Sequence, residues 1–131
     1  MSADLRAAWG HLLRLSDSTG LFEHAQGAMP RRNHGYCVDD VARGLVVLAR
    51  EPHLTPPLQR LAERYLTFVA HAQIHTGAVH NRLSFDRRWI DAAGSGDWWG
   101  RALWGLGTLA GRSRHDWLRD EALSRFELSA A

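Results

Sequence analysis

Four aspartates have the side-chain chemistry that glycoside cleavage requires, namely Asp39, Asp40, Asp86 and Asp97. Glycoside hydrolysis uses one carboxylic acid to protonate the leaving oxygen and a second carboxylate to activate water or to attack the sugar carbon. We interpret Asp40, Asp86 and Asp97 as the candidate catalytic residues, with Asp86 acting together with one of the other two.

A structural explanation competes with catalysis for two of these aspartates. Asp39 and Asp97 each stand where a helix is expected to begin, so each could cap its N-terminus. Each is also followed four residues later by an arginine, Arg43 and Arg101, which predicts an ion pair within the helix. Asp40 and Asp86 have no such simple structural explanation.

Further polar and aromatic residues could hold a sugar. Tryptophan faces stack on the C–H faces of sugar rings, which makes Trp89, Trp98 and Trp99 candidates, although packing at the mouth of the fold is an equal explanation. The predicted substrate-binding residues are His34, Tyr36, Asp39, Asn81, Arg82, Arg87, Trp89 and Arg101. The other tryptophans, Trp9, Trp104 and Trp117, lie on apolar helix stripes and are predicted to be core residues.

Other chemistries have weaker support. His71 and His75 are one helical turn apart, but no glutamate completes a zinc-binding motif with them. Cys37 is predicted to be a small buried residue rather than a nucleophile. The pair of glycines at 105 and 107 lies inside a helical pattern, which is the wrong context for a nucleotide fingerprint. We predict neither a cofactor nor a metal.

Composition narrows the class of protein. The 131 residues are 45% hydrophobic and carry a net charge of +2, and all 16 basic residues are arginines. The arginine pairs at 31–32 and 87–88 are isolated, so a nucleic-acid footprint is not expected. No apolar run is long enough for a bilayer. The single cysteine and the lack of an apolar leader favour the cytoplasm.

Apolar periodicity predicts an all-α fold of five helices in a single domain spanning 1–131. The expected helices cover 3–15, 39–50, 56–75, 97–110 and 116–128, and 79–85 could be briefly extended. The helices at 39–50 and 97–110 are apolar nearly all round and should be buried. The other three are amphipathic and should form an outer layer. The last should bury Trp117, Leu118, Leu123 and Phe126.

An internal repeat supports this alternation. The pattern Asp-x-x-small-Arg-small-Leu-x-x-Leu begins at Asp39 and again at Asp97, an offset of 58 residues. Repeats of this size indicate stacked helical units. If the two inner helices run parallel, the long loops at 16–38 and 76–96 lie together above their N-termini. Long loops on a rigid scaffold commonly carry function.

Three segments together resemble a known family. They are 34–40 (HGYCVDD), 81–89 (NRLSFDRRW) and 94–107 (GSGDWWGRALWGLG). They are similar to a helical-toroid domain of the six-hairpin glycosidase-like superfamily, whose relatives occur fused to or beside bacterial glycosyltransferases. The resemblance covers roughly residues 9–110. It implies part of an (α/α)6-type toroid, of which this chain supplies about two and a half hairpins.

The chain departs from that family in the third segment. Relatives carry an acidic residue where Gly96 stands and small polar or histidine residues where Trp98 and Trp99 stand. Three hypotheses follow: a carbohydrate-active, glycosidase-like domain that binds or processes an oligosaccharide, a non-catalytic module serving a glycosyltransferase, and a truncated remnant whose barrel another polypeptide completes.

Overall fold

The computed structural model describes residues 3–21, 25–26, 29–30 and 34–131, and it describes side chains within 9–21 and 34–131. Its described part is mostly helical, which confirms the all-α prediction. The helices are α1 (Ala3–Arg14), α2 (Val38–Arg50), α3 (Pro56–Ala72), α4 (Asp97–Arg112) and α5 (Asp116–Ala130). The arginine pair at 31–32 lies outside the described residues.

Short strands tie the loops together. They are β1 (Ala25–Gln26), β2 (Met29–Pro30), β3 (Tyr36–Cys37) and β4 (Arg82–Leu83). β1 pairs antiparallel with β2, and β3 pairs antiparallel with β4, with Tyr36 opposite Leu83. The extended segment expected at 79–85 therefore contains β4, which joins the second long loop to the first.

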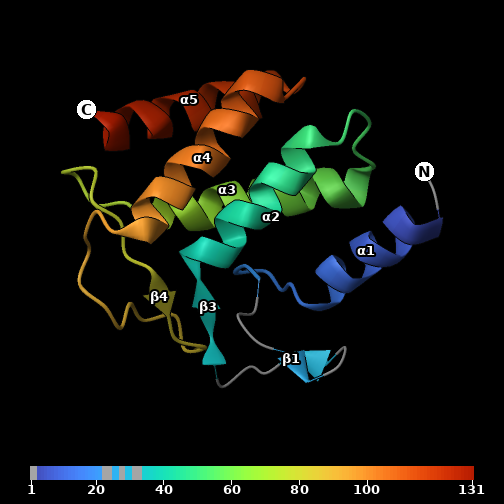
Figure 1. Ribbon diagram of the computed structural model, residues 1–131, viewed down its shortest axis with the longest axis horizontal. Helices are drawn as coiled ribbons and strands as arrows, with labels where there is room; N and C mark the ends of the chain where they lie inside the picture. The colour runs from blue at the N-terminus through green and yellow to red at the C-terminus, as the bar shows by residue number, and fades with distance from the viewer. Residues whose placement is uncertain (1–2, 22–24, 27–28, 31–33) are drawn as a thin grey trace.

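The helices α2 and α4 run side by side and form the centre of the fold (Figure 1). A hollow of about 420 Å³ near their C-terminal ends is lined by Leu48 of α2 and Leu109 of α4. At the other end, Asp39 of α2 pairs with Arg101 of α4. The two helices are therefore parallel, as the repeat predicted. α3 lies against α2, and α5 lies against α4.

α2 is the most deeply buried helix. Its buried residues are Val38, Val41, Ala42, Gly44, Leu45, Val46, Leu48 and Ala49. α3 packs against this helix with an apolar stripe in which Leu61, Tyr65 and Val69 are buried. Burial of a large apolar side chain contributes about 1.5–3 kcal/mol, so this contact supplies much of the core's stability.

The core prediction was wrong for two tryptophans. Trp9 is buried, but Trp104 is 47% exposed and Trp117 is 57% exposed. For Trp104 the cause is that α4 is covered by α2 on one side and α5 on another, which leaves a third arc of α4 facing solvent. α4 therefore buries only Ala102, Gly105, Leu106 and Leu109.

α5 also differs from its predicted orientation. Leu118 is buried as expected, but Leu123 is 47% exposed, and the other buried residues are Ala122 and Ser129. Ser129 is held in place because the Gln73 amide donates to its hydroxyl at 2.6 Å and that hydroxyl donates to the Gly77 carbonyl. The same contacts explain why α3 ends at Ala72, three residues before the predicted end. After Ala72 the chain turns to bond α5.

Among the described residues, none of the helices combines the length and the apolar character that crossing a membrane requires.

Candidate functional site

The loops capping α2 and α4 hold most of the predicted site residues. The N-cap residues are Cys37 for α2 and Gly96 for α4, and neither makes a side-chain capping hydrogen bond. The prediction that Asp39 and Asp97 are N-caps was therefore wrong. Both lie inside the first helical turn, where a carboxylate interacts favourably with the helix dipole.

Asn81 takes over the capping of α2 from a distant loop. Its backbone carbonyl accepts the Val38 N–H at 2.8 Å, and its side-chain oxygen accepts the Asp39 N–H at 3.3 Å. These contacts satisfy donors that a helix leaves unpaired at its N-terminus. Asn81, predicted as a substrate-binding residue, thus has a structural function.

Asp91 fixes the position of that loop, and the sequence interpretation missed it. Its carboxylate accepts the backbone N–H groups of Asn81 at 2.6 Å and Arg82 at 3.0 Å. Its backbone carbonyl lies 2.8 Å from Nδ1 of His80. No local pattern reveals such a residue, because its partners lie nine to eleven positions away.

Asp39 makes the ion pair between the two central helices. Its Oδ1 lies 2.8 Å from Nε of Arg101 on α4 and 3.8 Å from Nε of Arg43 on its own helix. The i,i+4 pair predicted for Asp39 and Arg43 is present. Arg101 bonds across to α2 instead of pairing with Asp97. Oδ1 is buried and has no hydrogen bond of good geometry within the described chain, so the contact with Arg101 is chiefly electrostatic.

Asp40 lies one residue further into α2. The buried thiol of Cys37 donates to its Oδ2 at 3.2 Å. Cys37 is buried, as predicted.

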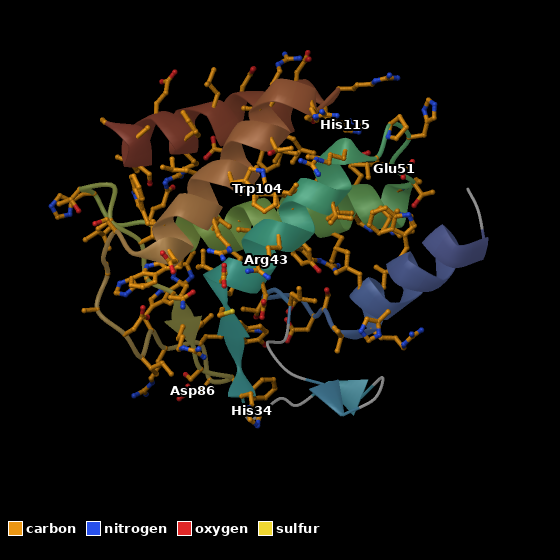
Figure 2. All side chains as sticks on the ribbon, in the orientation of Figure 1. His34, Arg43, Glu51, Asp86, Trp104 and His115 are labelled. Carbon is orange, nitrogen blue, oxygen red and sulfur yellow. The ribbon has the colours of Figure 1, made fainter. Side chains whose placement is uncertain are left out.

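Asp86 stands in a tight exposed turn beyond β4. Ser84 donates its hydroxyl to Asp86, and Arg88 lies 3.5 Å from the other carboxylate oxygen. The side chain of Asp86 remains 67% exposed. Figure 2 shows Asp86 and His34 at the outer end of the β3–β4 ribbon, well below Arg43 on α2 in this view.

Arg87 is the sole non-glycine residue in the described ranges with a positive φ, at 67°. A left-handed conformation costs a non-glycine residue about 1–3 kcal/mol, so surrounding contacts must hold it. One such contact is visible: Nε of Arg87 donates to the Thr19 hydroxyl at 3.0 Å. Arg87 therefore connects the second long loop to the first.

A pocket of about 290 Å³ lies beside this turn. Its lining residues are Asp17, Tyr36, Phe85, Asp86 and Arg87. Three of them are predicted site residues. Asp17 and Phe85 were missed. The Ser-Asp-Ser-Thr-Gly run at 16–20 signals a turn in which an aspartate bonds its own backbone. Asp17 does so, accepting the N–H groups of Thr19 at 2.8 Å and Gly20 at 3.0 Å.

Tyr36 also lines this pocket. Its hydroxyl donates to Oδ2 of Asp17 at 2.5 Å. Burial first, and then the hydrogen bond to Asp17 and the charge of that carboxylate, together raise the pKa of Tyr36 to about 12 against the opposing effects of Thr19 and Arg87. Tyr36 is thus a neutral donor that holds the Asp17 carboxylate in position.

A basic groove of about 540 Å³ adjoins this pocket through Arg87. Arg60, Arg64, Thr67 and His71 follow one face of α3, and Glu63 is the one acid among the groove's lining residues. Within the described ranges, no carboxylate forms an ion pair with Arg60, Arg64 or Arg87. The groove therefore presents guanidinium groups that can bind hydroxyl and carboxylate oxygens.

The loop tryptophans are engaged in packing. His80 stacks on Trp89 with ring centroids 5.2 Å apart, and Phe68 meets Trp89 edge-on at 5.7 Å. The indole N–H of Trp98 donates to the Val79 carbonyl at 2.7 Å. Trp99 is half-buried against the core. These contacts favour the packing explanation over sugar stacking.

Five of the predicted site residues line two separate hollows. Tyr36, Asp86 and Arg87 line the loop pocket, whereas Asp97 and Arg101 line a shallow groove along α4 that shares no residue with it. Arg82 is exposed, and its backbone bonds Asp91. In the part of the chain described, no three histidine, cysteine, aspartate or glutamate side chains gather into a metal site.

No protein-family model matches this chain, and no curated protein matches it.

Proposed function

We propose that this chain is a carbohydrate-active domain, part of an α/α toroid, that binds an oligosaccharide in the loop pocket lined by Asp17, Tyr36, Phe85, Asp86 and Arg87. The observation that supports this most is the pocket's composition. It combines two carboxylates, a guanidinium and a half-exposed aromatic ring at the loop end of the parallel helices.

Each chemical group suits a sugar. The Phe85 ring is 50% exposed and offers an apolar face for sugar C–H groups. Asp86 can accept hydrogen bonds from sugar hydroxyls, and Arg87 can donate to them. The adjoining basic groove extends this surface along α3 and favours a sugar chain that carries carboxylates or other anionic groups.

Binding has more support than hydrolysis. Asp17 already accepts three hydrogen bonds, so its carboxylate is engaged in holding the first long loop. Asp86 lies at the outer end of the ribbon, whereas Asp40 and Asp97 lie in the first turns of α2 and α4. A glycosidase pair requires carboxyl groups within roughly 5–9.5 Å of each other. A non-catalytic module associated with a glycosyltransferase therefore fits better than a complete hydrolase.

A thermal-shift screen tests the proposal. A panel of neutral and uronate-containing oligosaccharides is added to the purified chain, since a ligand that binds only the native state raises its melting temperature. We expect a shift with at least one uronate-containing sugar. Asp86→Asn and Phe85→Ala should each weaken binding roughly ten- to hundredfold, the loss expected for one charged hydrogen bond or one stacked ring.

Asp120→Asn is the matched control, because Asp120 is an exposed aspartate on α5, remote in sequence from the pocket. It should leave the shift unchanged. A folded chain that shows no shift with any sugar contradicts the proposal. Turnover of the bound sugar that Asp86→Asn abolishes would instead support the glycosidase hypothesis.

A further inference from the structure

α2 contacts α4 through one of its faces. The equivalent face of α4, as defined by the repeat, is exposed. The 58-residue repeat makes Asp39, Ala42 and Val46 of α2 equivalent to Asp97, Gly100 and Trp104 of α4. The first three residues lie in a built interface, and the second three do not.

On α2, Asp39 and Ala42 contact α4, and Val46 is buried one turn after Ala42. A Cβ atom at Gly105 would lie 3.0 Å from the Ala42 carbonyl oxygen and 3.4 Å from its Cα and Cβ, so the two backbones touch there. Val46 is 2% exposed. Asp39 is neutralised by Arg101 at 2.8 Å. The contact between α2 and α4 therefore combines close backbone approach, apolar burial and an ion pair.

On α4, the equivalent positions are not packed against another helix in the same way, although the Arg50 guanidinium of α2 lies 5.9 Å from the centroid of the Trp104 ring. No atom lies within 4 Å of a Cβ built at Gly100, and Trp104 is 47% exposed. Asp97 is exposed, and no arginine among the described residues forms an ion pair with it. Two shallow hollows of about 660 and 550 Å³ run along this face, and Trp104 lines both. We call Asp97, Gly100 and Trp104 the acceptor face.

α2 exposes the complementary face. Arg101 and Gly105, with which α4 docks onto α2, are equivalent to Arg43 and Val47. The Arg43 side chain is 53% exposed and Val47 is 52% exposed. We call Arg43 and Val47 the donor face. Figure 2 shows Arg43 on the side of α2 turned toward the viewer, as Trp104 is on α4.

The sizes and charges of the two free faces match. In the built interface a donor glycine, Gly105, meets an acceptor alanine, Ala42. On the free faces glycine is again one of the two partners, because Val47 would meet Gly100, where an added Cβ meets nothing within 4 Å. Asp97 offers the carboxylate for Arg43, just as Asp39 does for Arg101. An exposed tryptophan beside a charged pair is also typical of an interface anchor.

We propose that a second copy of this chain docks head to tail, with α2 of one copy lying on α4 of the other. Arg43 of one copy then pairs with Asp97 of its neighbour, and Val47 lies over Gly100. Such an interface is heterologous, because two different surfaces meet, and it repeats until the assembly closes. The contact concerns the two central helices.

Charge reversal tests this interface, with mass measured by light scattering after size exclusion over a range of protein concentrations. The natural chain should form discrete, concentration-dependent assemblies. Arg43→Asp and Asp97→Arg should each weaken self-association at least tenfold, because each variant places like charges together at its own interface. Mixing the two variants should restore assembly, because every contact in an alternating series is again oppositely charged.

A steric variant covers the case in which charge reversal damages folding. Gly100→Leu fills space that is empty in the single chain, so its circular dichroism should remain unchanged while assembly is lost. Glu63→Arg is the control and should assemble like the natural chain, because Glu63 lines the groove on α3 and neither hollow of the acceptor face. A natural chain that stays monomeric at every concentration overturns the proposal. So does an oligomer, or an aggregate of the kind expected from a truncated remnant, that survives both charge reversals.

Discussion

Nε of Arg101 lies 2.8 Å from Oδ1 of Asp39, so the arginine of the second repeat neutralises the aspartate of the first. Arg43 stays near the same oxygen from its own helix at 3.8 Å. One carboxylate therefore receives both repeat arginines. The charged residues of the repeat therefore connect α2 to α4, in addition to forming the i,i+4 pair within α2.

Arg101→Met should lower the free energy of unfolding by about 1–2 kcal/mol. This lies between the small effect of exposed ion pairs and the 3–5 kcal/mol of fully buried ones, because both side chains are about one-third exposed. Asp39→Asn combined with Arg101→Met should cost less than the sum of the single changes. Urea denaturation of the four proteins measures this coupling. Strict additivity would contradict the importance of the pair.

Asp91→Ala should destabilise the chain by about 2 kcal/mol, because two backbone N–H groups lose a charged acceptor. The loss should spread to α2, since Asn81 caps that helix only while its own loop is held. Hydrogen exchange should therefore accelerate at Asn81, Arg82 and Val38 together. Faster exchange at Asn81 and Arg82 alone would show that the cap does not depend on Asp91.

Two glycines of α4 should respond in opposite directions to alanine. Gly100→Ala should stabilise the chain by about 0.5–1 kcal/mol, because the helix gains propensity and the added methyl meets nothing within 4 Å. Gly105→Ala should destabilise it by about 1–3 kcal/mol, because the methyl presses on the Ala42 backbone. Thermal unfolding of the two variants at low protein concentration compares them. Equal stabilisation would mean that the two helices are not in close contact.

The tyrosines should resist ionisation in the native state. The chain has two, Tyr36 and Tyr65. Burial, followed by Asp17, raises the pKa of Tyr36 from 10.0 to about 12, and burial raises the pKa of Tyr65 above its ordinary value, with Ser16 opposing it.

Because both pKa values are higher in the folded state, both phenols contribute their full stabilisation below pH 10. For Tyr36 that contribution is lost as the pH rises through about 12. Ultraviolet titration should show little phenolate until the chain begins to unfold, and Tyr36→Phe should leave a single late titration. Ordinary ionisation near pH 10 in a folded sample would contradict the assigned burial.

Local sequence was sufficient for the helices. Apolar periodicity and proline and glycine positions predicted α2 from Asp39 and α4 from Asp97, within one residue of their observed starts. α3 ended early because Gln73 and Ser129, which are 56 residues apart, bond each other. Periodicity also misjudged Trp104. Apolar periodicity predicts that a helix has an apolar face, but it does not predict which neighbouring helix covers that face.

The candidate site was only partly predictable. Asp86 and Arg87 stood out because they lie in a polar loop between buried helices, and they do line a pocket. Asp17 and Asp91 did not stand out, because their importance lies in hydrogen bonds to Tyr36 and to Asn81.

The sequence by itself determined the all-α class, the five helices and the repeat that makes α2 and α4 equivalent, because these depend on short-range periodicity and on turn-forming residues. The tertiary structure alone decided that Arg101 pairs with Asp39 rather than Asp97, that Asn81 caps α2, and that Asp86 and Asp97 line separate hollows. The physical reason is that such contacts depend on the relative rotation of packed helices and the path of long loops. Both are set by the whole core at once.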